Sequence, residues 1–168
     1  MKKIILLILI SMFYTLINAQ NKYAGCNIDQ LTKGANGMIW ENDSLKLTFI
    51  PTDYFWKITI ENKTVFKASI NWDEVMFIRN KKSSKIIFDN TIRLKMNDPL
   101  GETLIASKSE ILKEIFPVDL WWETGPYPVF KKKSLRKEGN MNVRIIIPIS
   151  VDNKKNDYEF SFLISPSE

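Results

Sequence analysis

The clearest structural signal in the chain is an alternation of apolar and polar residues near its C-terminus, where residues 143–164 read VRIIIPISVDNKKNDYEFSFLI. Apolar residues occupy every second position from 143 to 149, and again from 158 to 164. A period of two is typical of a β-strand with one buried face. Residues 152–157 between the two runs are all polar and predict a turn. The stretch therefore predicts an antiparallel β-hairpin that closes the core of the domain.

Shorter runs of the same kind precede this hairpin. They lie at residues 45–49, 56–60, 64–70, 75–78, 86–88 and 92–96. Turn-forming residues separate them at short intervals, a pattern typical of an all-β sandwich. We therefore expect an antiparallel β-sandwich domain over residues 42–168. Its predicted core consists of Leu47, Phe49, Trp56, Ile58, Ile60, Phe66, Phe77, Phe88, Leu94, Ile145, Ile147, Phe160 and Phe162.

One segment leaves helix and strand open. Residues 107–116 contain Ile111, Leu112 and Ile115 at helical spacing, with serines that can cap a helix and a proline that can end it. The segment is also short enough to be a strand. The sequence therefore predicts either one short helix or a further strand at this position.

The N-terminus has the pattern of a secretory signal peptide. Two lysines precede an apolar run over residues 4–17, and Ala19 supplies a small residue at the cleavage site. The apolar run is short for a membrane span, which takes about 20 residues. We expect residues 1–19 to be removed, so that the mature chain begins at Gln20. An uncleaved N-terminal anchor is the alternative.

The segment after the leader contains a second possible export signal. Residues 20–41 are mostly polar with three glycines, and predict a loosely ordered lead-in to the domain. Within them, residues 23–26 read YAGC and resemble the lipobox of bacterial lipoproteins. Cys26 is therefore a candidate lipidation site, and a free or buried thiol is the alternative. The protein is expected to be periplasmic or extracellular, or else tethered to a membrane as a lipoprotein.

Four stretches carry a resemblance to a protein family. They are residues 70–78 (INWDEVMFI), 115–117 (IFP), 143–149 (VRIIIPI) and 158–162 (YEFSF). With the leader and the abundance of Lys, Asn and Ile, they make the chain resemble small exported β-sandwich proteins of Bacteroidota, an uncharacterised group of secreted proteins and lipoproteins. The resemblance implies an immunoglobulin-like fold and brings no catalytic residues with it.

The composition excludes several kinds of chemistry. The chain has no histidine and one cysteine, so it has no Ser-His-Asp triad, no Cys-His pair and no intramolecular disulfide. Only four of the 24 basic residues are arginines, which argues against nucleic acid as a partner. The carboxylates are scattered and show no pairing typical of glycosidases. We therefore expect no enzymatic activity, no cofactor and no metal site.

Residues 120–137 form the most distinctive segment of the chain. Large aromatic residues stand there among glycine and proline, directly before five basic residues in seven positions. Either the segment is a recognition surface, with aromatics that stack on a ligand beside a cationic patch, or it is a long connection with a solvated basic tip. Adjacent tryptophans in a strand face opposite sides, so only one of the two can enter the core. The candidate ligand-binding residues are Trp121, Trp122, Tyr127, Lys131, Lys132 and Lys133.

Together these features predict an exported, non-catalytic β-sandwich protein with a binding or structural role in the bacterial cell envelope. The alternative is a carbohydrate- or lipid-recognition module that uses residues 120–137. The expected partner is a protein or glycan of the envelope. Contact with a membrane is expected only if Cys26 is lipidated.

Overall fold

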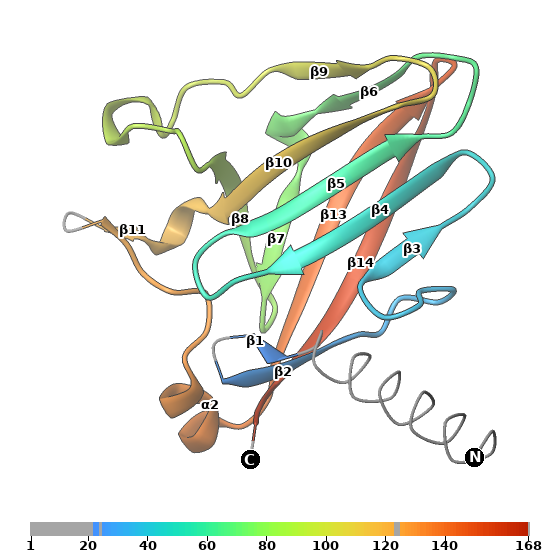
Figure 1. The fold of residues 1–168 in the computed structure, drawn as a ribbon. Coiled ribbons are helices and arrows are strands. Elements are labelled where there is room, and N and C mark those ends of the chain that lie inside the picture. The colour runs from blue at the N-terminus through green and yellow to red at the C-terminus, as the bar shows by residue number, and fades with distance from the viewer. Residues whose placement is uncertain (1–21, 24, 123–124, 168) are drawn as a thin grey trace, which may run out of the picture.

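The structure is a computed structural model that describes residues 22–23, 25–122 and 125–167 (Figure 1). The predicted signal peptide, residues 1–19, lies outside the described residues. Strands dominate the described part of the chain, and all the strand pairings found there are antiparallel. The expected all-β, antiparallel fold class is confirmed.

The elements follow one another in this order: β1 (Lys22–Tyr23), β2 (Cys26–Gln30), β3 (Ile39–Glu41), β4 (Leu45–Pro51), β5 (Trp56–Asn62), β6 (Ala68–Asn71), the 3₁₀-helix η1 (Trp72–Glu74), β7 (Met76–Arg79), β8 (Lys82–Phe88), the 3₁₀-helix η2 (Arg93–Lys95), β9 (Glu102–Ile105), β10 (Ser109–Pro117), the 3₁₀-helix η3 (Val118–Leu120), β11 (Trp121–Trp122), β12 (Gly125–Pro126), the α-helix α2 (Lys132–Glu138), β13 (Met141–Val151) and β14 (Lys154–Pro166).

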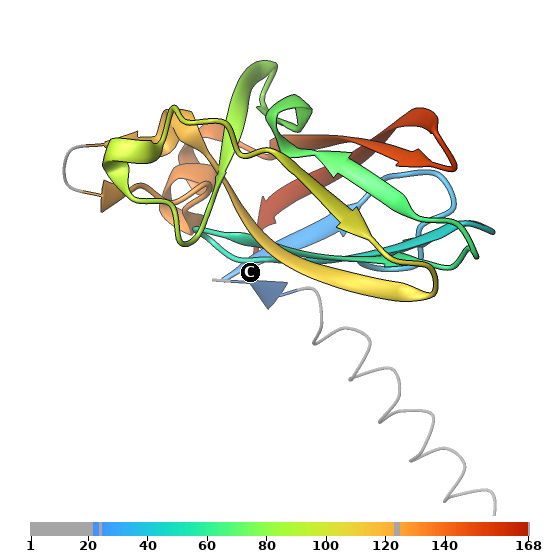
Figure 2. The ribbon, with the colours of Figure 1, turned by 90° about the horizontal axis from the view of Figure 1, so that it is seen from above.

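Twelve of these strands form a single curled sheet whose two halves pack against each other. One half contains β2, β14 and β13, with β6 and β7 pairing successive parts of β13 and β9 pairing β6. The other half contains β10, β5, β4 and β3. Figure 2 shows β13 and β14 in one layer, with β4, β5 and β10 in the other. β11 and β12 form a separate small ribbon.

The two halves are joined through β8, which changes partner along its length. Residues 82–85 pair with β7, and residues 86–88 pair with β10. A strand that switches partners in this way turns the corner between two packed layers. The hydrogen-bond ladder therefore runs without a break from one layer to the other.

The C-terminal hairpin is confirmed, with a tighter turn than expected. β13 and β14 pair from Met141–Ile164 to Val151–Lys154. Only Asp152 and Asn153 form the turn, both with positive φ, as a two-residue hairpin turn requires. Residues 154–157 extend the strand instead, because a polar run at a hairpin end can still continue the ladder.

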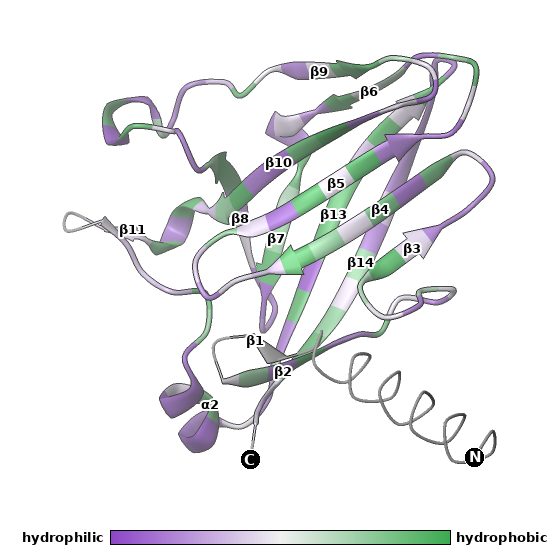
Figure 3. Ribbon diagram, in the orientation of Figure 1, coloured by the Kyte–Doolittle hydropathy of each residue, from purple (hydrophilic) through white to green (hydrophobic). Residues whose placement is uncertain are grey.

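Aromatic side chains fill the space between the two layers. The ring centroid of Phe49 on β4 lies 4.8 Å from that of Phe160 and 5.1 Å from that of Phe162, both on β14. The ring centroid of Trp56 on β5 lies 4.8 Å from that of Phe162 and 5.5 Å from that of Phe77 on β7. All five side chains are almost completely buried. Figure 3 shows the corresponding alternation of hydrophobic and hydrophilic residues along these strands.

Most of the predicted core is buried, but two of its members are not. Phe66 is 50% exposed and Leu94 is 93% exposed, so both predictions were wrong. Phe66 belongs to the connection between β5 and β6, and Leu94 lies in η2. Neither stands on a strand face directed at the opposite layer. Phe88, at the end of β8, is partly buried against the core.

The expectation of a loosely ordered lead-in over residues 20–41 is corrected by the structure for residues 25–41. β2 pairs with β14 along its whole length, and β3 pairs with β4. Cys26 and Ile28 on β2 are fully buried. The packed domain therefore starts before residue 42, because β2 belongs to the sheet and buries two side chains in the core.

The open choice at residues 107–116 resolves to a strand. β10 pairs with β5 over seven residue pairs and continues into its pairing with β8. The helix alternative was wrong because the partner strands, which are distant in sequence, determine this conformation. The described residues contain one α-helix, α2, which lies further along the chain in the basic part of the 120–137 segment.

The interlayer aromatic packing predicts where the fold is sensitive. We expect Phe162→Ala to lower the free energy of unfolding by about 3–5 kcal/mol, because it removes a large side chain that contacts both Phe49 and Trp56. Leu94→Ala is the matched control and should change it by less than about 0.5 kcal/mol. Urea denaturation followed by tryptophan fluorescence measures both. Equal effects of the two substitutions would contradict this packing.

Candidate functional site

In the 120–137 segment, residues 120–122 and 125–137 are held against the sandwich by buried side chains and backbone hydrogen bonds. Val129, Phe130 and Leu135 are each at most 3% exposed and belong to the core. The backbone N–H of Val129 donates to the carbonyl of Asp53 at 2.6 Å, and that of Tyr127 donates to the carbonyl of Leu120 at 2.8 Å. Residues 125–137 therefore have a defined conformation against the sandwich.

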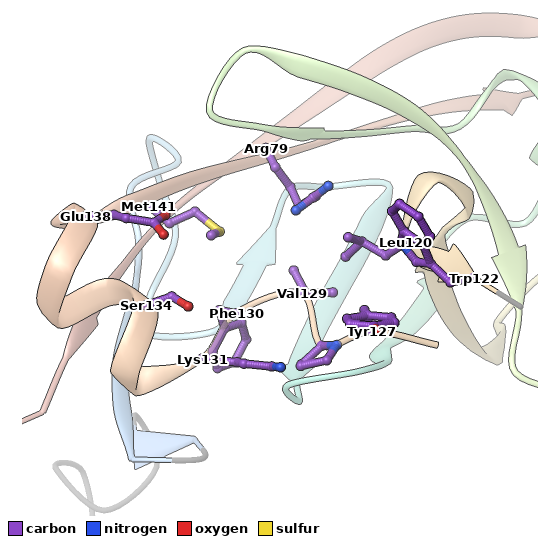
Figure 4. Close-up of a pocket in the computed structure, with 11 residues that line it drawn as sticks. Arg79, Leu120, Trp122, Tyr127, Val129, Phe130, Lys131, Ser134, Glu138 and Met141 are labelled. Atoms are coloured by element: carbon purple, nitrogen blue, oxygen red, sulfur yellow. The ribbon is translucent and has the colours of Figure 1, made fainter. Parts of the chain in front are cut away.

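This arrangement leaves an open groove of about 470 Å³ between the end of β7, the segment after η3 and the helix α2 (Figure 4). Trp122 and Tyr127 form one end of it, and residues of α2 form the other. Arg79 and Val129 lie between the two ends. The residues that line the groove are Arg79, Leu120, Trp122, Tyr127, Pro128, Val129, Phe130, Lys131, Ser134, Glu138 and Met141.

The two adjacent tryptophans have different surroundings, as predicted. Trp121 is partly buried and packs edge-on against Phe116, with 6.1 Å between ring centroids. Trp122 is 60% exposed and lies 6.0 Å from the ring of Tyr127, which is itself 47% exposed. Trp122 and Tyr127 thus present two neighbouring aromatic surfaces to solvent within the groove.

The three predicted lysines are separated by the helix. Lys131 lines the groove, with its ammonium 5.6 Å from the centre of the Tyr127 ring. Lys132 instead donates a hydrogen bond of 3.1 Å to the hydroxyl of Ser167 near the C-terminus. Lys133 is exposed and is not part of the groove lining. Of the six candidate residues, the structure brings together Trp122, Tyr127 and Lys131.

Sequence reasoning missed the groove residues that come from elsewhere. Arg79 arrives from the end of β7, more than 40 positions before the aromatic segment. Ser134 and Glu138 lie one turn apart on α2 and face the same side, as residues at i and i+4 do. A helical interpretation of residues 132–138 would have identified this pair, but nothing local to Arg79 signals its position.

An ion pair holds Arg79 at the groove. Its guanidinium nitrogen Nη2 lies 2.7 Å from Oδ2 of Asp119, and the ammonium of Lys82 lies 3.2 Å from the same oxygen. The backbone N–H of Asp119 donates to the hydroxyl of Ser84 at 3.2 Å. Burial by itself raises the pKa of Asp119, but the charge of Arg79 and the hydrogen bonds from Lys82, Arg79 and Ser84 outweigh it, so that the pKa is lower than usual.

The structure places the candidate lipidation residue Cys26 inside the sandwich. Its side chain is fully buried on β2, opposite Pro166 of β14. Burial raises the pKa of the thiol because it disfavours the charged thiolate, while the nearby charge of Lys132 acts in the opposite direction. The thiol is therefore buried in the folded chain, and lipidation of Cys26 stays a prediction from the sequence.

The described residues contain no group of three or more Cys, Asp or Glu side chains arranged to hold a metal ion. None of the helices in the same residues is long and apolar enough to cross a membrane.

Comparisons with known proteins give little on function. No model of a protein family matches the chain, and no curated protein is significantly similar to it. Among solved structures, the chain is similar to one described as the crystal structure of a protein from Archaeoglobus fulgidus. The two share 12% sequence identity, with a TM-score of 0.34, over 74% of this chain and 96% of the other.

The Asp119 ion pair predicts a pH dependence of stability. A carboxylate whose pKa is lowered in the folded state stabilises that state above its unfolded pKa of about 4, and this stabilisation is lost as the pH falls through the lower, folded pKa. We expect Asp119→Asn to lower the free energy of unfolding at pH 7, and the difference from wild type to shrink below about pH 4.

Denaturation at a series of pH values measures this difference. Glu159→Gln is the control, because the Arg144–Glu159 pair is exposed on both sides and an exposed pair contributes about 0–1 kcal/mol. A difference for Asp119→Asn that stayed constant from neutral pH down to strongly acidic pH would contradict the assignment.

The burial of Cys26 predicts how its thiol reacts. In the folded mature protein, a thiol reagent such as Ellman's reagent should react far more slowly than after denaturation, because the sulfur is inaccessible. Intact mass spectrometry of the exported protein should show no acyl groups. A thiol that remained unreactive after denaturation, together with an added lipid mass, would establish lipidation instead.

Proposed function

We propose that the protein is an exported, non-catalytic binding protein of the bacterial cell envelope, and that it recognises a carbohydrate in the groove between β7, residues 120–131 and α2. The observation that carries this proposal is the pair of exposed aromatic rings, Trp122 and Tyr127, fixed side by side at one end of the groove. Export itself rests on the leader pattern in residues 1–19.

Carbohydrates suit such a surface because a sugar ring has both an apolar face and a rim of hydroxyl groups. The faces of Trp122 and Tyr127 offer apolar area for stacking. Arg79 and Lys131 supply donors to hydroxyl oxygens, and Glu138 supplies an acceptor. A groove with apolar walls and a few convergent polar groups is the usual form of a small-molecule site.

The described residues that line the groove include one carboxylate, whereas glycoside hydrolysis uses two. That chemistry takes two carboxylates on either side of the scissile bond, about 5–9.5 Å apart. Glu138 is the one carboxylate among the groove-lining residues, all of which the structure describes. Asp119 lies nearby, but its Oδ2 atom is engaged by Arg79 and Lys82. This distribution supports binding without turnover.

The aromatic pair gives the test of this function. Trp122→Ala should weaken binding to the preferred oligosaccharide by at least about tenfold, equivalent to ~1.4 kcal/mol, because a tryptophan that stacks on a ligand is a typical energetic hot spot. The ligand is identified first on a glycan array, and affinity is then measured by calorimetry. Leu112→Ala, at an exposed position on β10 away from the groove, is the matched control.

Three results would contradict the proposal: no glycan bound, binding unchanged by Trp122→Ala, or hydrolysis of the bound glycan. Anionic lipid spotted on the same array distinguishes the lipid alternative for this groove. Loss of glycan binding in Trp122→Ala with an unchanged unfolding curve would establish that the ring contacts the ligand and is not needed for the fold.

A further inference from the structure

A second unusual surface lies at the end of the sandwich opposite α2 and β11. Three connections meet there: residues 63–67 between β5 and β6, residues 106–108 between β9 and β10, and residues 152–153 between β13 and β14 (Figures 1 and 2). The backbone N–H of Lys108 donates to the carbonyl of Thr64 at 3.1 Å, which joins two of them directly. We call residues 63–67, 106–108 and 152–154 together the lysine end.

A buried asparagine fixes the shape of the lysine end. Asn62 is fully buried, and its Nδ2 donates to the carbonyls of Phe66 at 2.7 Å and Ala106 at 3.0 Å. Its Oδ1 accepts from the backbone N–H of Thr64 at 3.0 Å and from the hydroxyl of Thr64 at 2.7 Å. Both the amide nitrogen and the amide oxygen of Asn62 thus form hydrogen bonds, so the connection from β5 to β6 has a defined conformation.

This fixed connection carries two apolar side chains in solvent. Val65 is 72% exposed and Phe66 is 50% exposed. Both border an open hollow of about 500 Å³ that also includes Tyr158. The sequence predicts Phe66 as a core residue, yet Asn62 holds the backbone so that the ring remains outside. Exposed apolar groups gathered on an ordered tip are typical of interaction sites.

Lysines surround this apolar tip. Lys63 and Lys67 flank it in the chain, while Lys108 and Lys154 border the hollow from the two other connections. Lys63 is paired with Glu41 at 2.6 Å. Lys67, Lys108 and Lys154 are exposed and form no salt bridge with any described acidic residue. Asp152 is the one acidic residue that lines the hollow, so positive charge prevails there.

We propose that the lysine end docks on a membrane surface with anionic lipid headgroups, with Val65 and Phe66 entering the boundary between headgroups and acyl chains. Two apolar side chains are too few for a stable protein interface, which buries about 800 Å² on each partner. They are sufficient for shallow insertion, and flexible lysines can keep their ammonium groups among the phosphates. The apolar tip thus matches the acyl-chain boundary of a membrane surface, and the surrounding lysines match its anionic headgroups.

This docking would not need an acyl chain on Cys26. It would also orient the molecule, because α2 and β11, which contribute residues to the groove, lie at the opposite end of the sandwich (Figure 1). A protein lying on the membrane through the lysine end presents the groove away from the lipid. The proposal is independent of the ligand that the groove binds.

Vesicle flotation with the purified exported protein tests the docking. Vesicles of phosphatidylcholine alone are compared with vesicles of equal parts phosphatidylcholine and phosphatidylglycerol. We expect binding to the anionic vesicles only, and expect it to weaken as salt is added, because the lysine contribution is screened. The double variant Val65→Ser/Phe66→Ser should bind at least about tenfold more weakly, and Lys67→Glu should weaken binding as well.

The control is Leu104→Ser/Leu112→Ser, which removes two equally exposed leucines from β9 and β10 outside the lysine end and should leave vesicle binding unchanged. Unfolding curves of all variants check that the fold is intact. Absence of binding to anionic vesicles, or binding unaffected by Val65→Ser/Phe66→Ser, would overturn the proposal. So would self-association in sedimentation velocity that the double variant abolishes while no vesicle binding is seen, since the tip would then contact a second copy.

Discussion

The packing of Trp56 against Phe162 between the two layers is the contact on which the rest of the structure depends. Trp56 begins β5, which pairs with both β4 and β10, and Phe162 lies on β14, which pairs with both β13 and β2. Each ring therefore stands on a strand inside its layer. The contact sets the position of β5 relative to the C-terminal hairpin. Protein interiors are close-packed, so the two strands can shift little relative to each other.

Through β5, this packing determines the position of both candidate binding surfaces. Just before the strand, the carbonyl of Asp53 accepts the hydrogen bond from Val129 that holds the aromatic segment in place. At its last residue, Asn62 organises the lysine end. A shift of β5 by one residue would turn Trp56 to the outer face and displace both surfaces at once. The two ends of the molecule are thus coupled through the register of a single strand.

Local patterns in the sequence predicted the elements whose burial alternates residue by residue, above all the hairpin of β13 and β14 and the strands β4 and β5. They failed where the outcome depends on distant residues. β10 is a strand because β5 lies beside it, and Phe66 is outside because Asn62 holds its carbonyl. The groove follows the same rule: Trp122, Tyr127 and Lys131 are close in sequence and were identified, whereas Arg79 comes from the end of β7 and pairs with Asp119.

The two surfaces are held by different physical means, and this difference has a consequence. At the groove, Arg79 is positioned by an ion pair with a carboxylate that can be protonated. At the lysine end, Asn62 acts through a neutral amide that does not titrate. Acidification therefore weakens the support of the groove while leaving the hydrogen bonds of Asn62 at the lysine end intact. Lysines also keep their charge in acid, so the proposed attachment to an anionic surface would persist under conditions that weaken the support of the groove.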